Sequence, residues 1–322
     1  SSSGYFAGAC KGSLSFYKGV FILRKLARRL LIVLVAASVL LAAPLRACPK
    51  RIVSMSPVGT EILYALGQED RVVGVTDFCD YPPEVRKKPK IGGFAEISLE
   101  KVIAMKVDLL VLSDIHLRYK DDLDKLKIPC VFIMQDTLAS MYRSIFDVGR
   151  VCGAEKRAAV LVAKMKADVD AVRAKVEGLP RRRVVLSVSR ELAEPKVHVF
   201  YAAGRRTFYN ELLEAAGGVN VVPPSHAEYP RISSEGLMVM DPEVIIDIVG
   251  EPEFYHSMEN TDVDRIFNKK NLREQWMRGP GVSAVGMGRV VILDGTVYLR
   301  PGPRVGRIAL SFAKALHPEA RW

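Results

Sequence analysis

Residues 97–111 read ISLEKVIAMKVDLLV, and residues 232–246, 135 positions later, read ISSEGLMVMDPEVII. Ile, Ser, Glu and Met recur in register, and both stretches end in an acidic residue followed by three apolar ones. Each stretch has the pattern of a short helix followed by a buried strand. A unit that occurs twice indicates two similar lobes, and two lobes can enclose a ligand of some size in the cleft between them.

Short apolar segments alternate with helical patterns around the first stretch. The expected strands lie at residues 51–55, 72–75, 109–112 and 130–134. Strands that alternate with helices are typical of a largely parallel sheet covered on both faces. We therefore expect an α/β fold with two lobes, each containing a mainly parallel sheet covered by helices.

A long helix is predicted at residues 155–176, where Ala, Val, Leu and Lys recur at helical spacing until Gly178 and Pro180 end the pattern. At 1.5 Å per residue such a helix spans about 33 Å, enough to run along both lobes and join them. The alternative is an ordinary covering helix of the second lobe.

These features divide the chain into four parts, which its 322 residues accommodate comfortably. We predict a signal peptide with an N-terminal extension at 1–47, an N-terminal ligand-binding lobe at 48–150, a linking backbone helix at 151–178 and a C-terminal ligand-binding lobe at 179–322.

The formal charge of +11 is concentrated at the N-terminus, because residues 1–47 contain seven Lys or Arg and no acidic residue. The rest of the chain has 40 basic and 36 acidic residues. A protein so nearly balanced lacks the charge that binding to a nucleic-acid backbone requires, which argues against that class of partner.

The N-terminal residues have the order of a secretory signal: a basic segment at 24–29, an apolar run at 30–43, and small residues before Cys48. The apolar run is short for a membrane span, which needs about 20 residues. We therefore expect export to the periplasm. Residues 45–48 also resemble a lipobox in which Cys48 would carry a lipid anchor, although Arg46 fits that motif poorly.

Three further cysteines, Cys79, Cys130 and Cys152, follow Cys48 without the paired spacing of a zinc site. The histidines are scattered as well, so we predict no metal site. Cys130 at the start of a strand and Cys152 near the end of the next helix are compatible with a disulfide in an oxidising compartment or with two free thiols.

The chain from residue 51 to residue 316 resembles the substrate-binding proteins of ABC importers for cobalamin and ferric siderophores. The motifs that carry this resemblance are RIVS at 51–54, SP at 56–57, TE at 60–61, DYPP at 80–83, ISLE at 97–100, DLLV at 108–111 and RPGPR at 300–304. The resemblance implies two α/β lobes joined by one long helix, a monomer without catalytic residues or resident cofactor, and delivery of a captured metal chelate to an ABC permease dimer with its ATPase subunits.

Within this family an exposed Glu on each lobe docks onto basic residues of the permease, and by motif position these are Glu100 and Glu235. A duplicated acid on a pseudo-symmetric protein can pair with the same patch on two identical subunits. The alternative is that each Glu caps its own helix, and the two roles are compatible.

The resemblance also implies aromatic residues that line the cleft, because flat rings suit a planar macrocycle such as cobalamin or a related corrinoid. The matching positions are Tyr81, Phe94, Tyr229 and Tyr298. Haem or a ferric siderophore is the alternative, since Tyr can bind haem iron and arginines can pair with carboxylates. The arginines available for this are Arg205, Arg206, Arg231 and Arg300. His116 follows a predicted strand at the edge where α/β sheets place ligands, so it is a further candidate contact.

An enzyme is the competing class, with Asp77, Asp80 and Asp114 as an acidic cluster at the sheet edge. The sequence contains none of the motifs GxxxxGK[ST], GxGxxG after a strand, HExxH or GxSxG. A surface adhesin is a third class, which would need no deep pocket. We therefore predict a binding protein and no catalytic residue.

Overall fold

The first lobe is built on a sheet of four parallel strands in the order β2-β1-β3-β4. In this computed structural model the described residues are 48–250 and 268–322. The strands are β1 (Ile52–Ser54), β2 (Val72–Val75), β3 (Leu109–Ser113) and β4 (Cys130–Ile133). The helices between and after them are α2 (Pro57–Ala65), α3 (Leu99–Ala104), α4 (Lys120–Lys125) and α5 (Leu138–Cys152), with short 3-10 turns at Glu69–Arg71, Pro83–Lys87 and Asp114–Tyr119.

All five residues of β3 are buried. A strand covered on both faces must be apolar throughout, which explains the continuous run that the sequence shows there. Because the strands are buried, polar side chains that could contact a ligand are found at the strand ends. Ser113 and Gln135, at the ends of β3 and β4, line the pocket described below.

The second lobe contains a mixed sheet, in which most strand pairings are parallel. Strands β5 (Arg182–Arg190), β7 (Gly218–Asn220), β9 (Val244–Val249) and β10 (Val290–Asp294) pair in parallel, whereas β6 (Val199–Ala202) and β8 (Arg231–Ser233) are antiparallel to their neighbours. Its helices are α7 (Phe208–Ala215), α8 (Ser234–Met240), α11 (Lys269–Met277), α12 (Ser283–Gly286) and α13 (Val305–Leu316), with a 3-10 turn at Thr296–Leu299.

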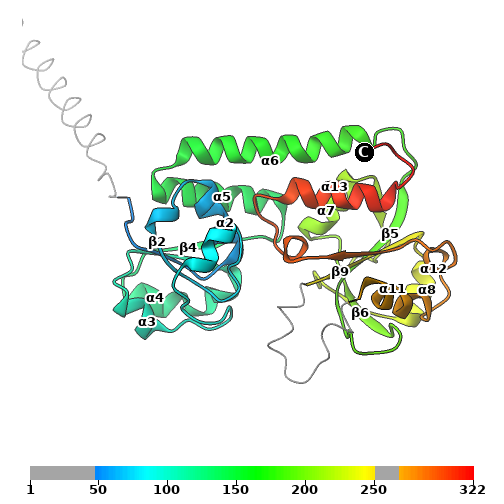
Figure 1. Ribbon diagram of the computed structural model, residues 1–322, viewed down its shortest axis with the longest axis horizontal. Coiled ribbons are helices and arrows are strands. Elements are labelled where there is room, and N and C mark those ends of the chain that lie inside the picture. Colours follow the sequence, from blue (N-terminus) through cyan, green and yellow to red (C-terminus); the bar gives the residue numbers. More distant parts are fainter. Residues whose placement is uncertain (1–47, 251–267) are drawn as a thin grey trace, which may run out of the picture. The chain divides into compact units, whose positions relative to one another are not determined.

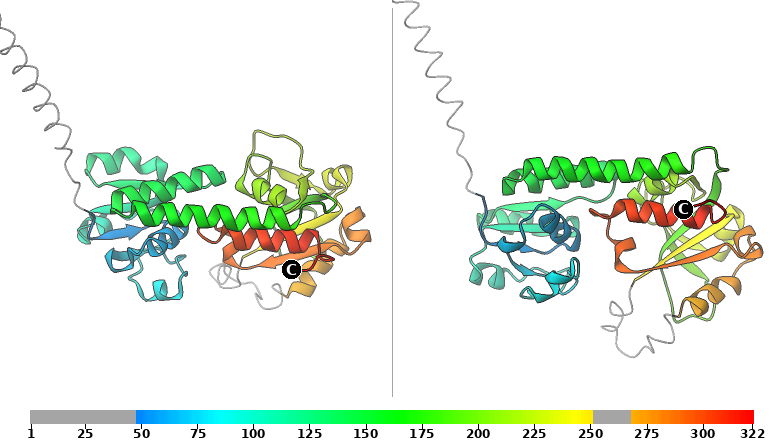
Figure 2. Two further views of the ribbon diagram at one scale, coloured as in Figure 1. Left: turned by 90° about the horizontal axis from the view of Figure 1, so that it is seen from above. Right: turned by 45° about the horizontal axis from the view of Figure 1, so that its top comes forward.

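The predicted long helix is confirmed as α6 (Glu155–Lys175), which has 21 residues. It contacts α5 of the first lobe and both α7 and α13 of the second (Figure 1). Figure 2 shows α6 beside α13 from two further directions. Its buried side chains recur three or four positions apart, from Ala158 to Val172, so one face packs on both lobes. The described residues from Cys48 onward belong to one compact unit that contains the two lobes.

The duplicated stretch forms the same structure twice. Ser98 and Ser233 cap α3 and α8, and each side chain accepts a hydrogen bond from the main-chain N–H three residues later. Each helix leads into a central strand, β3 or β9, of its own sheet. The helix-then-strand unit predicted from the repeat is therefore confirmed in both lobes.

The cysteines of the described part of the chain, Cys48, Cys79, Cys130 and Cys152, are all free thiols. The Cys130 thiol donates to the carbonyl oxygen of Ile128 at 3.2 Å. Of the two arrangements left open for Cys130 and Cys152, the structure has the free thiols. The predicted signal peptide and extension at 1–47 lie outside the described residues.

Candidate functional site

A pocket of about 270 Å³ lies where loops of the two lobes meet. Ser56, Pro57 and Val58 follow β1, and Ser113 and Gln135 lie at the carboxyl ends of β3 and β4. The second lobe contributes Thr296, Leu299 and Arg300, which follow β10, and two aromatic residues of the first lobe, Phe78 and Phe94, complete the lining. The pocket therefore lies at the carboxyl edge of both sheets, where α/β proteins bind ligands.

The segment between β10 and α13 connects the second lobe to the first through two ion pairs. Arg300, which is 9% exposed, pairs with Asp80. Arg304 donates from Nε to Oε2 of Glu61 at 2.8 Å and from a terminal nitrogen to Oε1, which makes a bidentate pair. Gly302 lies between these arginines, and a Cβ added there would lie 3.3 Å from a methyl group of Val58. The lobes thus approach closely beside the pocket.

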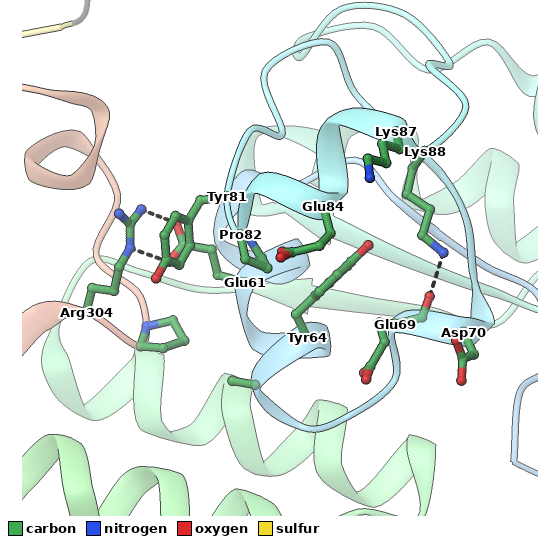
Figure 3. A pocket seen from close by; sticks show the side chains of 12 residues that line it. Glu61, Tyr64, Glu69, Asp70, Tyr81, Pro82, Glu84, Lys87, Lys88 and Arg304 are labelled. Carbon is green, nitrogen blue, oxygen red and sulfur yellow. Dashed lines mark hydrogen bonds and ion pairs between the residues drawn. The ribbon is translucent and has the colours of Figure 1, made fainter.

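Tyr81 lies on the outer side of this junction. The Arg304 guanidinium stacks on its ring, 3.9 Å from the ring centre (Figure 3). The ring is 41% exposed and lines a second, more open hollow of about 810 Å³ next to Tyr64 and Glu84. Tyr81 does not line the 270 Å³ pocket. The sequence predicts one ligand site that contains Tyr81, Phe94 and Arg300, but only Phe94 and Arg300 line this pocket.

Phe94 and His116 are in contact. The Phe94 ring lies edge-on to the His116 ring with 5.9 Å between centres, and to the Phe78 ring at 6.4 Å. His116 is fully buried, and both of its ring nitrogens have partners: Nδ1 accepts from the N–H of Ser113 at 3.1 Å, and Nε2 lies 2.7 Å from the Phe94 carbonyl oxygen. Burial lowers the pKa of His116. The imidazole therefore supports the pocket wall and presents no free nitrogen to the pocket.

Tyr229 belongs to the second lobe, and acidic residues of the first lobe lie close enough for their charges to act on it. Its ring is 38% exposed and lies edge-on to Tyr209 at 6.4 Å. Burial, together with the charges of Glu228, Asp114 and Asp136, raises the pKa of Tyr229 to about 12. Asp114 and Asp136 follow β3 and β4 of the first lobe, so Tyr229 is placed across the junction from the carboxyl edge of that sheet.

The remaining predicted residues lie outside the pocket lining. Arg205 is exposed and donates from Nε to the carbonyl oxygen of Val222 at 3.1 Å. Arg231 is exposed on β8. The Tyr298 hydroxyl lies 3.1 Å from that of Ser311 on α13, so this phenol is directed toward the helix.

Phe78, Gln135 and Asp136 were not among the residues predicted from the sequence. Gln135 Oε1 and Asp136 Oδ1 are buried and have no hydrogen-bond partner among the described residues. The main-chain carbonyl of Asp136 accepts from the N–H of Phe208 at 2.6 Å, which joins the first lobe to α7. Their position directly after β4 is the signal that could have identified them, because ligands gather at the carboxyl ends of parallel strands.

Glu100 and Glu235 are both exposed, and each is the second residue of its helix. The pKa of Glu235 is lowered, because its carboxylate accepts hydrogen bonds from the Ser233 hydroxyl and from its own main-chain N–H. Three residues later each helix presents a large apolar side chain to solvent, Ile103 at 54% exposure and Met238 at 48%. The two motifs thus present equivalent acidic and apolar groups.

No set of three or more His, Cys, Asp or Glu side chains within residues 48–250 and 268–322 is arranged to hold a metal ion. Within the same residues, no helix combines the length and the apolar character needed to cross a membrane.

Comparison with known proteins shows a consistent group. The family model described as "Periplasmic binding protein" matches residues 52–294. An uncharacterised ABC transporter substrate-binding lipoprotein, YvrC of Bacillus subtilis strain 168, is 29% identical over 279 residues, covering 84% of this chain and 81% of that protein. A vitamin B12-binding protein of Pectobacterium carotovorum is 24% identical over 222 residues, covering 68% and 78%.

A solved structure agrees with these sequence matches. It is that of a possible iron-binding, periplasmic solute-binding protein from Staphylococcus epidermidis, with a TM-score of 0.64 and 26% identity. The match covers 84% of this chain and 99% of that one.

Proposed function

This chain belongs to the periplasmic binding protein family, and on that premise we propose that it captures cobalamin or a related corrinoid between its lobes and delivers it to a membrane permease. It is a substrate-binding protein of an ABC importer, of the type that includes vitamin B12-binding, haem-binding and siderophore-binding proteins. Relatives of this kind bind solutes and catalyse no reaction, which agrees with the prediction that the chain is not an enzyme. The observation that carries the ligand proposal is the aromatic and charge-neutralised lining of the 270 Å³ pocket.

The charges beside the pocket favour an uncharged ligand. Arg300, the arginine in the lining, is already paired with Asp80, and neighbouring Arg304 is paired with Glu61. An arginine held in this way is a poor partner for a ligand carboxylate, because binding would have to break a largely buried ion pair. A corrinoid carries amide side chains in place of the free carboxylates of haem.

The unpartnered acceptors point to the same class of ligand. Gln135 lines the pocket and Asp136 follows it in the chain; Gln135 Oε1 and Asp136 Oδ1 are both buried without a donor among the described residues. Buried acceptors are costly unless a donor reaches them. The N–H groups of corrinoid amides are donors of the required kind, and Phe78 and Phe94 offer flat apolar surface beside them.

The size of the pocket determines how such a ligand sits. Sites for drug-sized ligands measure roughly 300–1,000 Å³, so a hollow of about 270 Å³ holds one edge of a corrinoid. The rest of the macrocycle would extend along the junction of the lobes toward Tyr229, which is close enough to Asp114 and Asp136 of the first lobe for their charges to act on it. Phe94 and Tyr229 would then contact the ligand from opposite lobes.

A ferric siderophore or haem is the second candidate. Arg205 and Arg231 are exposed on the second lobe, and their charges are available to carboxylates at the surface. The similarity to the possible iron-binding protein from Staphylococcus epidermidis is the reason to include iron compounds in the test. Ligand-binding roles for Tyr81, His116 and Tyr298 remain predictions, and the structure places all three outside the pocket lining.

Docking to the permease dimer is assigned to Glu100 and Glu235. Their equal positions in α3 and α8 give the protein two matched negative groups. A partner made of two identical subunits presents its own basic patch twice, so both contacts form together and strengthen each other. We propose that the mature protein is a monomer in the periplasm, with Cys48 as its lipid attachment point if it is anchored.

Calorimetric titration with cyanocobalamin, haemin and a ferric siderophore tests the ligand proposal. We expect stoichiometric binding of cyanocobalamin and weaker binding of the two iron compounds. Tighter binding of haemin or the siderophore would replace the corrinoid proposal with the iron candidate. The double variant Arg300→Ala with Asp80→Ala gives a second test. If the two charges only neutralise each other and do not contact the ligand, this variant should bind cyanocobalamin as the wild type does.

A further inference from the structure

The segment that carries Phe94 has no regular secondary structure of its own. Residues 91–98 form neither helix nor strand. Gly92 adopts a φ of 121°, and a Cβ added to Gly92 or Gly93 would meet nothing within 4 Å. Glycines in open space give a backbone many accessible conformations, so the place of the Phe94 ring depends on what holds the segment.

Two neighbouring side chains of the 3-10 turn after β3 hold it. His116 Nε2 lies 2.7 Å from the Phe94 carbonyl oxygen, and a guanidinium nitrogen of Arg118 donates to the Ala95 carbonyl oxygen at 2.5 Å. The turn itself is fixed to the sheet, because it continues directly from the buried strand β3. Consecutive carbonyls of the segment are therefore tied to the carboxyl edge of the sheet.

The hydrogen bond of Ser113 determines which nitrogen of His116 carries the proton. The Ser113 N–H is a donor, so Nδ1, 3.1 Å away, must be the acceptor. The neutral ring then has its proton on Nε2 and donates it to the Phe94 carbonyl oxygen. Burial lowers the pKa of His116 and so favours this neutral form; the nearby Arg118 acts in the same direction and Asp114 opposes it.

We propose that His116 is a positioning residue for ligand binding: the bond from Nε2 to Phe94, together with the edge-on contact of the two rings, fixes the Phe94 side chain as one wall of the inter-lobe pocket. This inference rests on the proposed function only in requiring that the pocket bind a ligand. It assigns His116 a role through Phe94, whereas the sequence predicts a direct ligand contact for this residue.

A matched pair of substitutions separates the two hydrogen bonds of His116. The side-chain nitrogen of Gln reaches the place of Nε2, so His116→Gln keeps a donor for Phe94 and loses the acceptor for Ser113. The side-chain oxygen of Asn reaches the place of Nδ1, so His116→Asn keeps the acceptor and loses the donor. Both variants place an amide in the same site and both lose the edge-on ring contact with Phe94, so the difference that the pair tests is which hydrogen bond remains.

The first measurement needs no ligand: the rate at which chymotrypsin cleaves after Phe94 in the folded protein. Loss of the bond to Phe94 releases the segment, so we expect cleavage of His116→Asn about tenfold faster than wild type, in line with the strength of one hydrogen bond. His116→Gln should stay within about twofold of wild type. Equal rates for Asn and Gln variants would overturn the proposal.

The second measurement is the dissociation constant for cyanocobalamin in the same three proteins. We expect about tenfold weaker binding for His116→Asn and near-normal binding for His116→Gln. If wild type binds no cyanocobalamin, the ligand proposal fails, whereas the cleavage rates still decide the role of His116. Faster cleavage of the Asn variant with unchanged affinity would contradict the part of the proposal that links Phe94 to the ligand.

Discussion

The ion pair between Glu61 and Arg304 is expected to be a main energetic link between the lobes. Glu61 lies on α2 of the first lobe with its side chain 2% exposed, and Arg304 precedes α13 of the second with 16% exposed. Removing one partner of a buried pair leaves an uncompensated charge and typically costs about 3–5 kcal/mol. We therefore expect Glu61→Ala to lower the free energy of unfolding by about 3 kcal/mol.

A double-mutant cycle isolates the interaction from the other contacts that each residue makes. Arg304→Ala also removes the stacking on Tyr81, but this loss appears equally with and without Glu61 and cancels in the cycle. We expect the double variant to be more stable than the sum of the single effects predicts, with a coupling energy of about 2 kcal/mol. Urea unfolding followed by circular dichroism provides the four free energies.

The exposed pair Lys120 and Asp124 on α4 is the matched control. Solvent and salt screen such a pair, so its cycle should show no measurable coupling. Additive effects of Glu61→Ala and Arg304→Ala would refute the reasoning, because the two side chains would then stabilise the protein independently.

Three further predictions concern uptake, the ligand and pH. Glu100→Ala combined with Glu235→Ala should abolish uptake of radiolabelled cyanocobalamin by cells, while the affinity of the purified protein stays unchanged. Glu177 is also exposed, and Glu177→Ala should leave uptake normal. A loss of affinity in the double variant would contradict the docking role. Phe94→Ala should weaken cyanocobalamin binding by about tenfold or more in calorimetry, since an aromatic side chain contributes at least 1.5 kcal/mol when buried, and unchanged affinity would exclude Phe94 from the site. Because the folded protein holds the pKa of His116 below its ordinary value of 6.5, the unfolded chain binds this proton more readily. The free energy of unfolding should therefore decrease as the pH falls below about 6.5. Urea titrations at pH 7 and pH 5 measure this decrease, and His116→Gln should remove the part that His116 causes. An identical decrease in the variant would show that other groups cause it.

The repeat and the long helix were predictable because their signals are local. The Ser and Glu at each helix start and the apolar triplet that follows lie within 15 residues, and α6 shows its period over 21 residues without a break. Patterns of this length report the secondary structure directly. The two-lobed α/β fold followed from them.

The antiparallel part of the second sheet was not predictable in the same way. Strands β6 and β8 have four and three residues, and their pairing joins segments about 30 positions apart. Three or four residues are too few to show an alternating hydrophobic pattern, and such a pattern would not give the direction of a strand. The pairing depends on tertiary contacts. The expectation of mainly parallel sheets is confirmed, but it did not include the antiparallel pairings of β6 and β8 in the second lobe.

The site shows the same distinction between local and distant causes. Phe94 and Arg300 were identified and do line the pocket. Two contacts of the site join residues far apart in sequence: Arg304 stacks on Tyr81, and His116 bonds to the Phe94 carbonyl. No sequence motif predicts contacts of this kind. Gln135 was within reach of sequence reasoning, because it directly follows a strand end.

The most direct test of the account is a crystal structure of the protein with cyanocobalamin. The account predicts the corrinoid between the lobes, in contact with Phe94 of the first lobe and Tyr229 of the second, with the Arg300–Asp80 pair intact. A corrinoid bound to one lobe alone, or in the outer hollow beside Tyr81, would contradict it.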